Sequence, residues 1–545
     1  MAPRPERVLT AQTTHAEPDG RFSPFRLCSP APRPTLLARS SSTTVSTGRI
    51  RRSLVILSKT FVVLLGLLIL FVLEENTRGW VGLQLYLHQL RSQGEKLTLA
   101  ELELPKPPKA NNGAAALLAA AGELQSLSCS CPLASEPPGT MKLVAPGKAQ
   151  VLCKQPTLKG LNSNREWQVY EWGDLSRQLD EASIPLQHVR EALRQPSLDL
   201  DLDYSQGFSL LLPHLNQAQN VARWLNSAAL DDVHRGNLDE TITNIAAIAS
   251  LTKFQKNERL WISQLVRMAI GQIGLTMTWE ALQAPGWNDD QLARLSEAWR
   301  AEHTFSDVVR TAEGERALTL VGFDSLRQHR SERMAEMGYR FDAVWEYGQW
   351  VRDYSQERAR KFHVFLASEL WTVLWSYQDE CQALHWAQAT LDTARTVEKR
   401  KSWTPVPLPP AANGCDDASL KCARFYFSNM AASPGLQDVL LKDLFFETQR
   451  EMTRAAIAIK RCQLRTGKLP SDLATLVPEY LPELPYDWMD GNPLRYRLNP
   501  DGTFTLYSIG EDGKDHGGDP SFRTDRWRPG LWHGRDAVWP SPATD

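Results

Sequence analysis

The feature that most constrains this chain is an apolar stretch of 21 residues from Ser53 to Leu73, which contains one charge, Lys59. A helix of that length covers roughly 30 Å, which matches the hydrocarbon thickness of a bilayer. Lys59 lies near the N-terminal end, where its long side chain can reach the headgroups. We therefore predict a transmembrane helix over residues 53–73.

A buried core helix and a cleaved signal peptide are the alternatives to a membrane span here. A core helix seldom has so long an uncharged run as Thr60 to Leu73, which is apolar on almost every side. A signal peptide needs small residues at its cleavage site, whereas Glu74 and Glu75 follow the run here. Both observations favour a membrane anchor.

The charges beside the apolar stretch predict its orientation. Residues 1–52 contain nine arginines, no lysine and three acids, and Arg49, Arg51 and Arg52 lie next to the stretch. Positive flanks stay in the cytoplasm. We expect an N-terminus in the cytoplasm and an extracytoplasmic C-terminal part. The tail is rich in Pro, Ser and Thr, which predicts disorder, with an Arg-rich transit peptide as the alternative.

A chain of 545 residues is long enough for two to four domains. A net charge of −2 gives no general attraction to nucleic acid, so we predict no nucleic-acid partner. Breaks rich in proline and glycine predict seven segments: a disordered basic tail (1–52), the membrane helix (53–73), a juxtamembrane helix and loop-rich linker (74–165), a helical domain (166–402), a proline-rich loop and helix (403–450), a C-terminal α+β module (451–522) and a tail (523–545).

Helical periodicity dominates residues 166–402. Leu292, Leu295 and Trp299 recur at i, i+3 and i+7, as on one face of a helix. Gly236 suits a helix end and Asn237 suits the cap of the next helix, so two helices should meet there. The unit resembles a tetratricopeptide-type hairpin, but no repeat of about 34 residues is present. The predicted fold class is mainly α, with a helical array or bundle.

The pattern changes near the C-terminus. An apolar helix from Met452 should end near Gly467, and two strand-like stretches, 494–498 and 503–509, flank a turn that contains Asp501-Gly502. Asp-Gly between alternating apolar residues is a strong hairpin signal. A loop dense in Gly and Asp follows.

This segment resembles the globular part of type II secretion major pseudopilins. The resemblance covers about 70 residues and is carried by an ordered set of short motifs: Gly467-Lys468-Leu469-Pro470, Leu476-Val477, Tyr480-Leu481-Pro482, Leu484-Pro485, Gly491-Asn492-Pro493, Tyr496 and Leu506 to Gly510. In that family the last loop binds calcium. The resemblance implies side-chain ligands at Asp512, Asp519 and Ser521, with backbone oxygens of Ile509 and Gly517. Calcium prefers several oxygen ligands, whereas the alternative is a solvated turn.

The chain departs from the pseudopilin pattern at its N-terminus. Pseudopilins begin with a processed apolar helix that has glutamate at the fifth mature position, whereas Phe71 stands at that distance from Gly66 here. Filament assembly is therefore not implied. The rest of the chain looks like uncharacterised single-pass envelope proteins of planctomycete and verrucomicrobial bacteria. That likeness implies a location, the inner membrane of a bacterial envelope with a periplasmic C-terminal part, more than an activity.

No sequence motif indicates an active site. The chain contains none of the usual serine-hydrolase, zinc-protease, Walker A or dinucleotide-binding motifs. Cys129, Cys131 and Cys153 favour a disulfide over a metal site, and Cys415 and Cys422 are a second possible pair.

Several polar groups fit ordinary structural roles. Asp199, Asp201 and Asp203 would share one face of an extended chain and could bind a cation, although a solvated strand edge is the ordinary explanation. The histidines His214, His234, His303, His329, His363 and His385 show no ligand spacing.

Three functions fit these observations. The first is a membrane-anchored envelope protein whose helical part is a scaffold for unknown envelope proteins, with a calcium-stabilised C-terminal module. The second is an accessory component of a secretion or pilus-like machine. The third is an envelope hydrolase whose carboxylates are scattered in the sequence; a cleft with paired carboxylates would favour it.

Overall fold

The computed structural model describes residues 47–102, 111–127, 141–145, 148–151, 157–161, 167–300, 305–337, 354–403, 424–431, 435–500, 502–521 and 535–539. The chain divides into two units, residues 1–67 and 68–545. Helices dominate the described residues, which confirms the predicted mainly α fold class.

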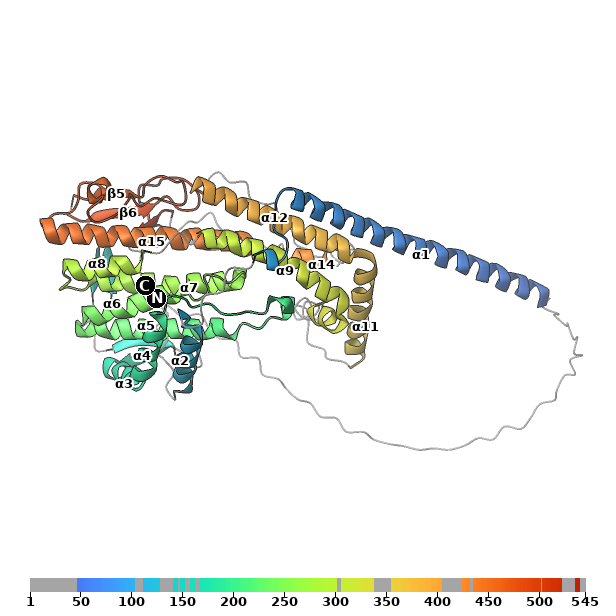
Figure 1. The fold of residues 1–545 in the computed structure, drawn as a ribbon, viewed down its shortest axis with the longest axis horizontal. Coiled ribbons are helices and arrows are strands. Elements are labelled where there is room, and N and C mark those ends of the chain that lie inside the picture. The colour runs from blue at the N-terminus through green and yellow to red at the C-terminus, as the bar shows by residue number, and fades with distance from the viewer. Residues whose placement is uncertain are drawn as a thin grey trace, which may run out of the picture. The chain divides into compact units, whose positions relative to one another are not determined.

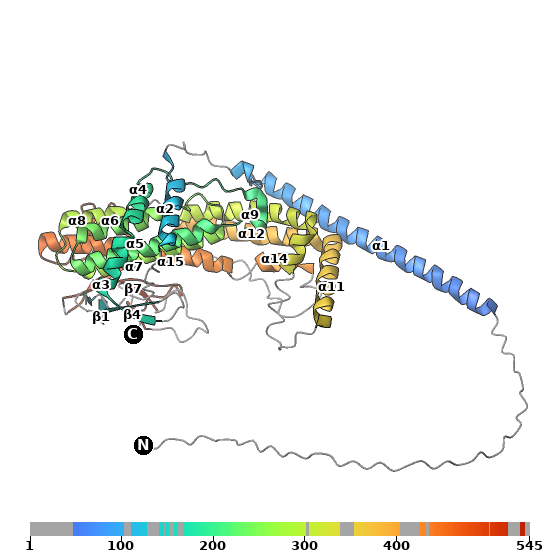
Figure 2. The same ribbon diagram turned by 90° about the horizontal axis from the view of Figure 1, so that it is seen from below.

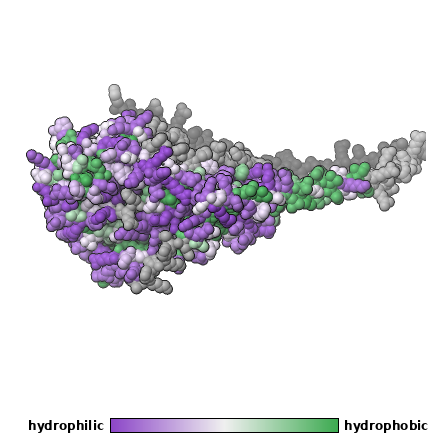
Figure 3. Space-filling view, turned by 45° about the horizontal axis from the view of Figure 1, so that its top comes forward, coloured by the Kyte–Doolittle hydropathy of each residue, from purple (hydrophilic) through white to green (hydrophobic). Residues whose placement is uncertain are grey.

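Helix α1 (Thr47–Ser92) contributes to both units. It is the one described helix that is long and apolar enough to cross a membrane. In the first unit its large apolar side chains are exposed on all sides, and Leu57, for example, is 70% exposed. Figure 3 shows apolar side chains gathered along this helix. From Leu68 the helix continues without a break to Ser92, so the juxtamembrane helix predicted at the start of residues 74–165 is part of α1.

Among the described residues, twelve further helices belong to the second unit, besides a short helical stretch at residues 330–337. These are α2 (Ala114–Ser126), α3 (Trp172–Glu181), α4 (Ser183–Leu193), α5 (Pro213–Arg235), α6 (Leu238–Leu251), α7 (Trp261–Gln283), α8 (Asp289–Ala298), α9 (Phe305–Gln328), α11 (Tyr354–Leu370), α12 (Ser376–Arg400), α14 (Tyr426–Ala431) and α15 (Gly435–Thr466), with short turns η1 (Ala100–Leu102), η3 (Tyr204–Ser209), η4 (Trp371–Trp375) and η5 (Leu473–Leu476). Figure 1 and Figure 2 show α5, α6, α7 and α15 side by side.

Helix α7 lies at the centre of this arrangement and packs against α5, α6, α9 and α15. Two glycines allow the close approach. A Cβ at Gly271 would lie 2.3 Å from the ring of Phe446 on α15, and a Cβ at Gly274 would lie 2.8 Å from the ring of Trp299. Since side chains at both positions would meet packed rings, glycine is required for this spacing.

The sequence predicted several local features of these helices correctly. Leu292, Leu295 and Trp299 are buried, as their spacing indicated. Helix α5 ends at Arg235, and Gly236 adopts a left-handed conformation with φ of 79°. Asn237 is the N-cap residue of α6, as predicted, but its side chain makes no capping hydrogen bond.

The second half of α1 is part of the folded second unit. Leu83, Leu87 and Leu90 are buried in a cluster with Leu384 of α12. Just beyond the helix, the carboxylate of Glu95 pairs with Arg316 at 2.8 Å and also binds Arg395. The segment that follows the apolar stretch is therefore fixed by both apolar packing and buried ion pairs.

The C-terminal module is larger than predicted. Strands β5 (Arg495–Leu498) and β6 (Phe504–Ser508) form the predicted antiparallel hairpin, in which Tyr496 pairs with Leu506. A third strand, β7 (Ala537–Trp539), pairs with β6, although this segment was predicted to be a tail. The preceding helix α15 begins at Gly435, so the predicted boundary at residue 451 falls inside a helix.

Two short hairpins lie at the end of the predicted loop-rich linker, and the second extends past it, because its last strand lies in the predicted helical domain. Strand β1 (Met141–Ala145) pairs with β2 (Lys148–Val151), and β3 (Thr157–Leu161) pairs with β4 (Trp167–Glu171). The predicted cysteine pairs lie outside the described residues. Residues 1–46, most of the predicted basic tail, also lie outside them.

The packing of α7 on α15 predicts the effect of one methyl group. Gly271→Ala should lower the free energy of unfolding by about 1–3 kcal/mol, because the new methyl overlaps the Phe446 ring. Gly122→Ala in α2 is the matched control: nothing lies within 4 Å of its Cβ, so alanine should stabilise the helix by up to about 1 kcal/mol. Thermal unfolding of both variants measures this, and an equal shift in both would contradict it.

Candidate functional site

The loop predicted to bind calcium follows strand β6 and turns through a series of left-handed glycines, including Gly510 and Gly517. Its centre holds the carboxylate of Asp536, which is 1% exposed. This carboxylate accepts backbone N–H bonds from His516, Gly518 and Asp519, the shortest of them 2.6 Å from Gly518. Burial raises the pKa of Asp536, although these hydrogen bonds oppose the shift. The loop is thus organised around a carboxylate of the chain itself.

Some of the residues predicted to bind calcium have contacts around this loop. The carbonyl of Gly517, a predicted ligand oxygen, accepts a 2.6 Å hydrogen bond from Arg497 of β5. At Ile509 the backbone N–H, not the predicted ligand oxygen, donates to Asp487. Asp519 accepts from the backbone N–H of Ser521. A guanidinium on a ligand carbonyl does not fit a cation site.

The side chain of Asp512 accepts a hydrogen bond from the backbone N–H of Lys514. Among the described residues, no group of three or more His, Cys, Asp or Glu side chains is placed to hold a metal ion. Calcium binding stays a prediction of the resemblance.

The three aspartates of residues 199–203 serve different local contacts. Asp199 binds Ser197 and Asn257, at 2.7 and 2.5 Å. Asp203 accepts the backbone N–H of Ser205 and so begins the turn η3. The sequence placed these carboxylates on one face, but the structure ties two of them to separate neighbours.

A buried group of Glu, His and Ser side chains lies between α5 and α7. The imidazole of His214 contacts the carboxylate of Glu258 at 2.9 Å, and Ser263 donates to the other oxygen of that carboxylate. A nucleophilic triad requires the serine to contact the histidine, whereas both groups here bind the glutamate. We interpret this group as a structural hydrogen-bond network.

Helix α15 carries a row of buried charges. Arg450 is 1% exposed and binds Glu447 and Glu451 at 2.8 and 2.9 Å, and it also donates to the carbonyl of Trp299. Burial and the neighbouring Glu447 raise the pKa of Asp443, one turn earlier. Asp443, Glu447 and Arg450 recur at i, i+4 and i+7, so they lie on one face of the helix.

Sequence reasoning missed this row, because the same spacing is typical of a solvated face. Arg450 and its two glutamates compensate one another inside the packed helices, so they fix the position of α15 against its neighbours.

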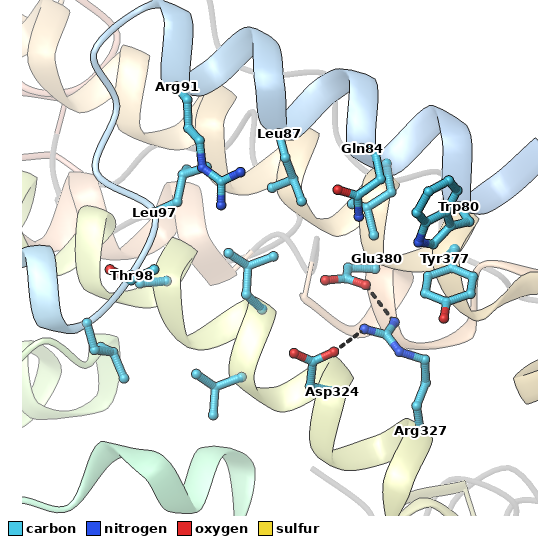
Figure 4. Close-up of a pocket in the computed structure, with 15 residues that line it drawn as sticks. Trp80, Gln84, Leu87, Arg91, Leu97, Thr98, Asp324, Arg327, Tyr377 and Glu380 are labelled. Atoms are coloured by element: carbon cyan, nitrogen blue, oxygen red, sulfur yellow. Dashed lines mark hydrogen bonds and ion pairs between the residues drawn. The ribbon is translucent and has the colours of Figure 1, made fainter.

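A cavity of about 470 Å³ lies beside the second half of α1. It is lined by residues 80–91 of α1, residues 97–99, residues 317–327 of α9 and residues 377–380 of α12. Figure 4 shows Trp80, Gln84 and Leu87 of α1 on one side and Arg327 on the other. Its volume lies in the range of small-molecule sites.

The polar wall of this cavity is centred on Arg327. The guanidinium binds Glu380 at 2.6 Å and also Asp324, and it lies 4.7 Å over the ring of Tyr377. Burial raises the pKa of Glu380 to about 7, and Asp324 and Asp379 add to this shift while Arg327 opposes it. Both carboxylates bind the same guanidinium, so this arrangement supports binding more than acid–base catalysis.

No family model, no curated protein and no solved structure matches this chain.

The loop around Asp536 predicts how calcium affects stability. Because Arg497 already donates to the Gly517 carbonyl and Asp536 already accepts N–H groups of this loop, we expect the melting temperature to be the same in millimolar calcium and in excess EGTA. Asp536→Ala should destabilise the module by roughly 2–4 kcal/mol, because it leaves buried N–H groups unpaired. Asp515→Ala, which removes an exposed carboxylate of the same loop, should cost less. A calcium-dependent rise would instead support the predicted site.

The raised pKa of Glu380 predicts a pH dependence of stability. Between its ordinary value of 4.5 and about 7, the folded carboxyl keeps a proton that the unfolded chain has lost. Its contribution to stability is complete below pH 4.5 and is lost as the pH rises through 7. The Glu380→Gln variant cannot ionise at this position. As the pH rises from 5 to 8, its free energy of unfolding should therefore rise relative to that of the wild type by on the order of 3 kcal/mol.

Glu95→Gln is the control with the opposite sign. Burial opposes the shift, but hydrogen bonds from Arg395 and Arg316 lower the pKa of Glu95 to about 2. Its ionised form therefore stabilises the fold above its ordinary pKa of 4.5, and this contribution is lost as the pH falls. This variant should be less stable than the wild type at pH 8. Thermal unfolding across this range measures both, and parallel profiles for Glu380→Gln and the wild type would refute the assignment.

Proposed function

We propose that this chain is a single-pass membrane protein of the bacterial envelope, whose helical part outside the cytoplasm is a scaffold for protein contacts. Helix α1 anchors it in the inner membrane, with the N-terminus in the cytoplasm. Its partners are lipid and other envelope proteins.

The exposure of the apolar run in α1 carries this proposal. Large side chains from Leu54 to Leu73 are exposed on every side of the helix. Each fully buried aliphatic side chain gains about 1.5–3 kcal/mol relative to water, so this surface is costly in water and favourable in lipid. A core helix of a soluble protein would have its apolar run covered.

The continuity of α1 supports an anchor over a cleaved signal peptide. The helix runs on from the apolar residues to Ser92, and its buried Leu83, Leu87 and Leu90 belong to the fold. Removal of a signal peptide after Leu73 would leave a folded helix with a new end beside Glu74. The acidic residues at that place also lack the small side chains of a cleavage site.

Buried polar side chains that bind one another support the scaffold role. Glu258 holds His214 and Ser263, Arg450 holds two glutamates, and Arg327 holds the two carboxylates of the cavity. These groups fix the helices relative to one another. A rigid helical array with a largely hydrophilic surface suits protein contacts. The calcium-stabilised module and a place in a secretion machine rest on the pseudopilin resemblance alone.

The anchor predicts the effect of charges in the middle of the apolar run. Leu64→Arg together with Leu65→Arg should release the full chain from the membrane fraction, because each arginine at the centre of a spanning helix costs about 2.5–3.5 kcal/mol. Leu211→Arg is the control: this leucine lies outside α1 and is 82% exposed, so the variant should stay in the membrane. Carbonate extraction of cell membranes followed by blotting measures the distribution.

Protease added to spheroplasts tests the orientation in the same cells. The wild-type chain should lose everything beyond α1 and keep its N-terminal tail. Recovery of the intact wild-type chain in the soluble fraction would overturn the proposal. Protection of its C-terminal part from external protease would overturn the orientation.

A further inference from the structure

Helix α11 and the turn η4 that continues it are apolar on two opposite faces. On the inner face Val364, Ser368, Trp371 and Leu374 recur at i, i+4, i+7 and i+10, and all four are buried. Trp371 lies 4.9 Å from the ring of Phe427. This face therefore holds α11 to the rest of the second unit.

The outer face of α11 carries a second row of large apolar side chains. They are Phe362, Phe365, Leu366, Leu370 and Val373. Phe362 is 61% exposed and Leu366 is 43% exposed. On a surface helix the face opposite the core is polar, and helices that are apolar all round lie in a core or a membrane.

This outer face lies at the end of the apolar run of α1. The carbonyl of Val373 accepts a 2.8 Å hydrogen bond from Asn76. Gln378 donates to the carbonyl of Glu75 at 2.8 Å. Asn76 is three residues beyond Leu73, which is about 4.5 Å along the helix axis. The C-terminal end of the outer face is therefore at the level where the predicted span leaves the hydrocarbon layer.

The direction of α11 fits the same boundary. In Figure 1 and Figure 2, α11 points away from the part of α1 that follows Leu68 and is not parallel to it. A helix at a bilayer surface is likewise not parallel to a helix that crosses the bilayer.

The charges around the outer face also suit a headgroup layer. Glu369 lies on this side of α11, and it pairs with Arg330 at 2.8 Å and with Arg333 at 3.2 Å. The Arg330 guanidinium lies 5.2 Å over the Phe365 ring. Arginine beside an aromatic ring is a favourable pair where apolar chains meet phosphate groups.

We propose that the outer face of α11 and η4 binds the extracytoplasmic surface of the bilayer that α1 spans, with phospholipid as its occupant. The proposal rests on the membrane anchor proposed above. Binding at a second place would restrict the tilt and rotation of the helical part relative to the membrane. It would also cover the apolar row that otherwise faces water.

Site-specific photocrosslinking of the full chain in vesicles of phosphatidylethanolamine and phosphatidylglycerol tests this proposal. A diazirine-bearing amino acid replaces Leu366 in one sample and Leu65, in the apolar run, in a second. It replaces Leu211, which is 82% exposed, in a third. All three positions are exposed, so the replacement should leave the fold intact. Mass spectrometry then measures the yield of lipid adduct at each position.

We expect lipid adducts at both Leu366 and Leu65, each about tenfold or more above Leu211, because an interfacial helix is buried in the acyl boundary. Adducts at Leu65 with none at Leu366 would overturn this proposal and leave the anchor intact. Crosslinks from Leu366 to a second copy of the chain would also overturn it, since another protein would then cover the face. Absence of adducts at Leu65 would overturn the anchor itself.

Discussion

Helix α1 has exposed apolar side chains in its first half and buried ones in its second half, and the position of the other helices depends on this difference. Its first half exposes leucine, valine and phenylalanine on every side, which is favourable in hydrocarbon. Its second half buries Leu83, Leu87 and Leu90 against α12, as an ordinary core helix does. Because one unbroken helix does both, the folded part begins within a few turns of the predicted bilayer surface.

The buried charges explain how the helices beyond that point hold a defined arrangement. Arg316 connects Glu95, just after α1, to Gln388 of α12. Arg450 connects two glutamates of α15 to the carbonyl of Trp299. Removing one partner of such a pair leaves a buried charge without compensation, which is strongly unfavourable. These pairs therefore make alternative packings of the same apolar helices costly.

The same principle accounts for the C-terminal loop. Backbone N–H groups of a glycine-rich turn converge on one point, and a negative group is needed there. Asp536, which precedes strand β7, supplies it from a segment with no obvious pattern in the sequence. The loop and the third strand are thus linked, since β7 places the carboxylate that organises residues 516–519.

The sequence by itself determined the elements whose signal is local. The period of Leu292, Leu295 and Trp299, the helix end at Gly236 and the hairpin of β5 and β6 all follow from neighbouring residues, so each was predicted in place. The apolar run of residues 53–73 is likewise a local signal, and the structure shows it as helix. The candidate site could not be predicted in this way. Arg327 and Glu380 are 53 residues apart.

The sequence shows that the outer face of α11 is apolar. Only the tertiary structure shows that the opposite face is the buried one and that no described residue covers the outer face. Tertiary structure decided which charges are buried and which apolar faces stay exposed. The physical reason is that burial depends on contacts between segments far apart in the sequence, whereas sequence periodicity shows only that a helix has an apolar face.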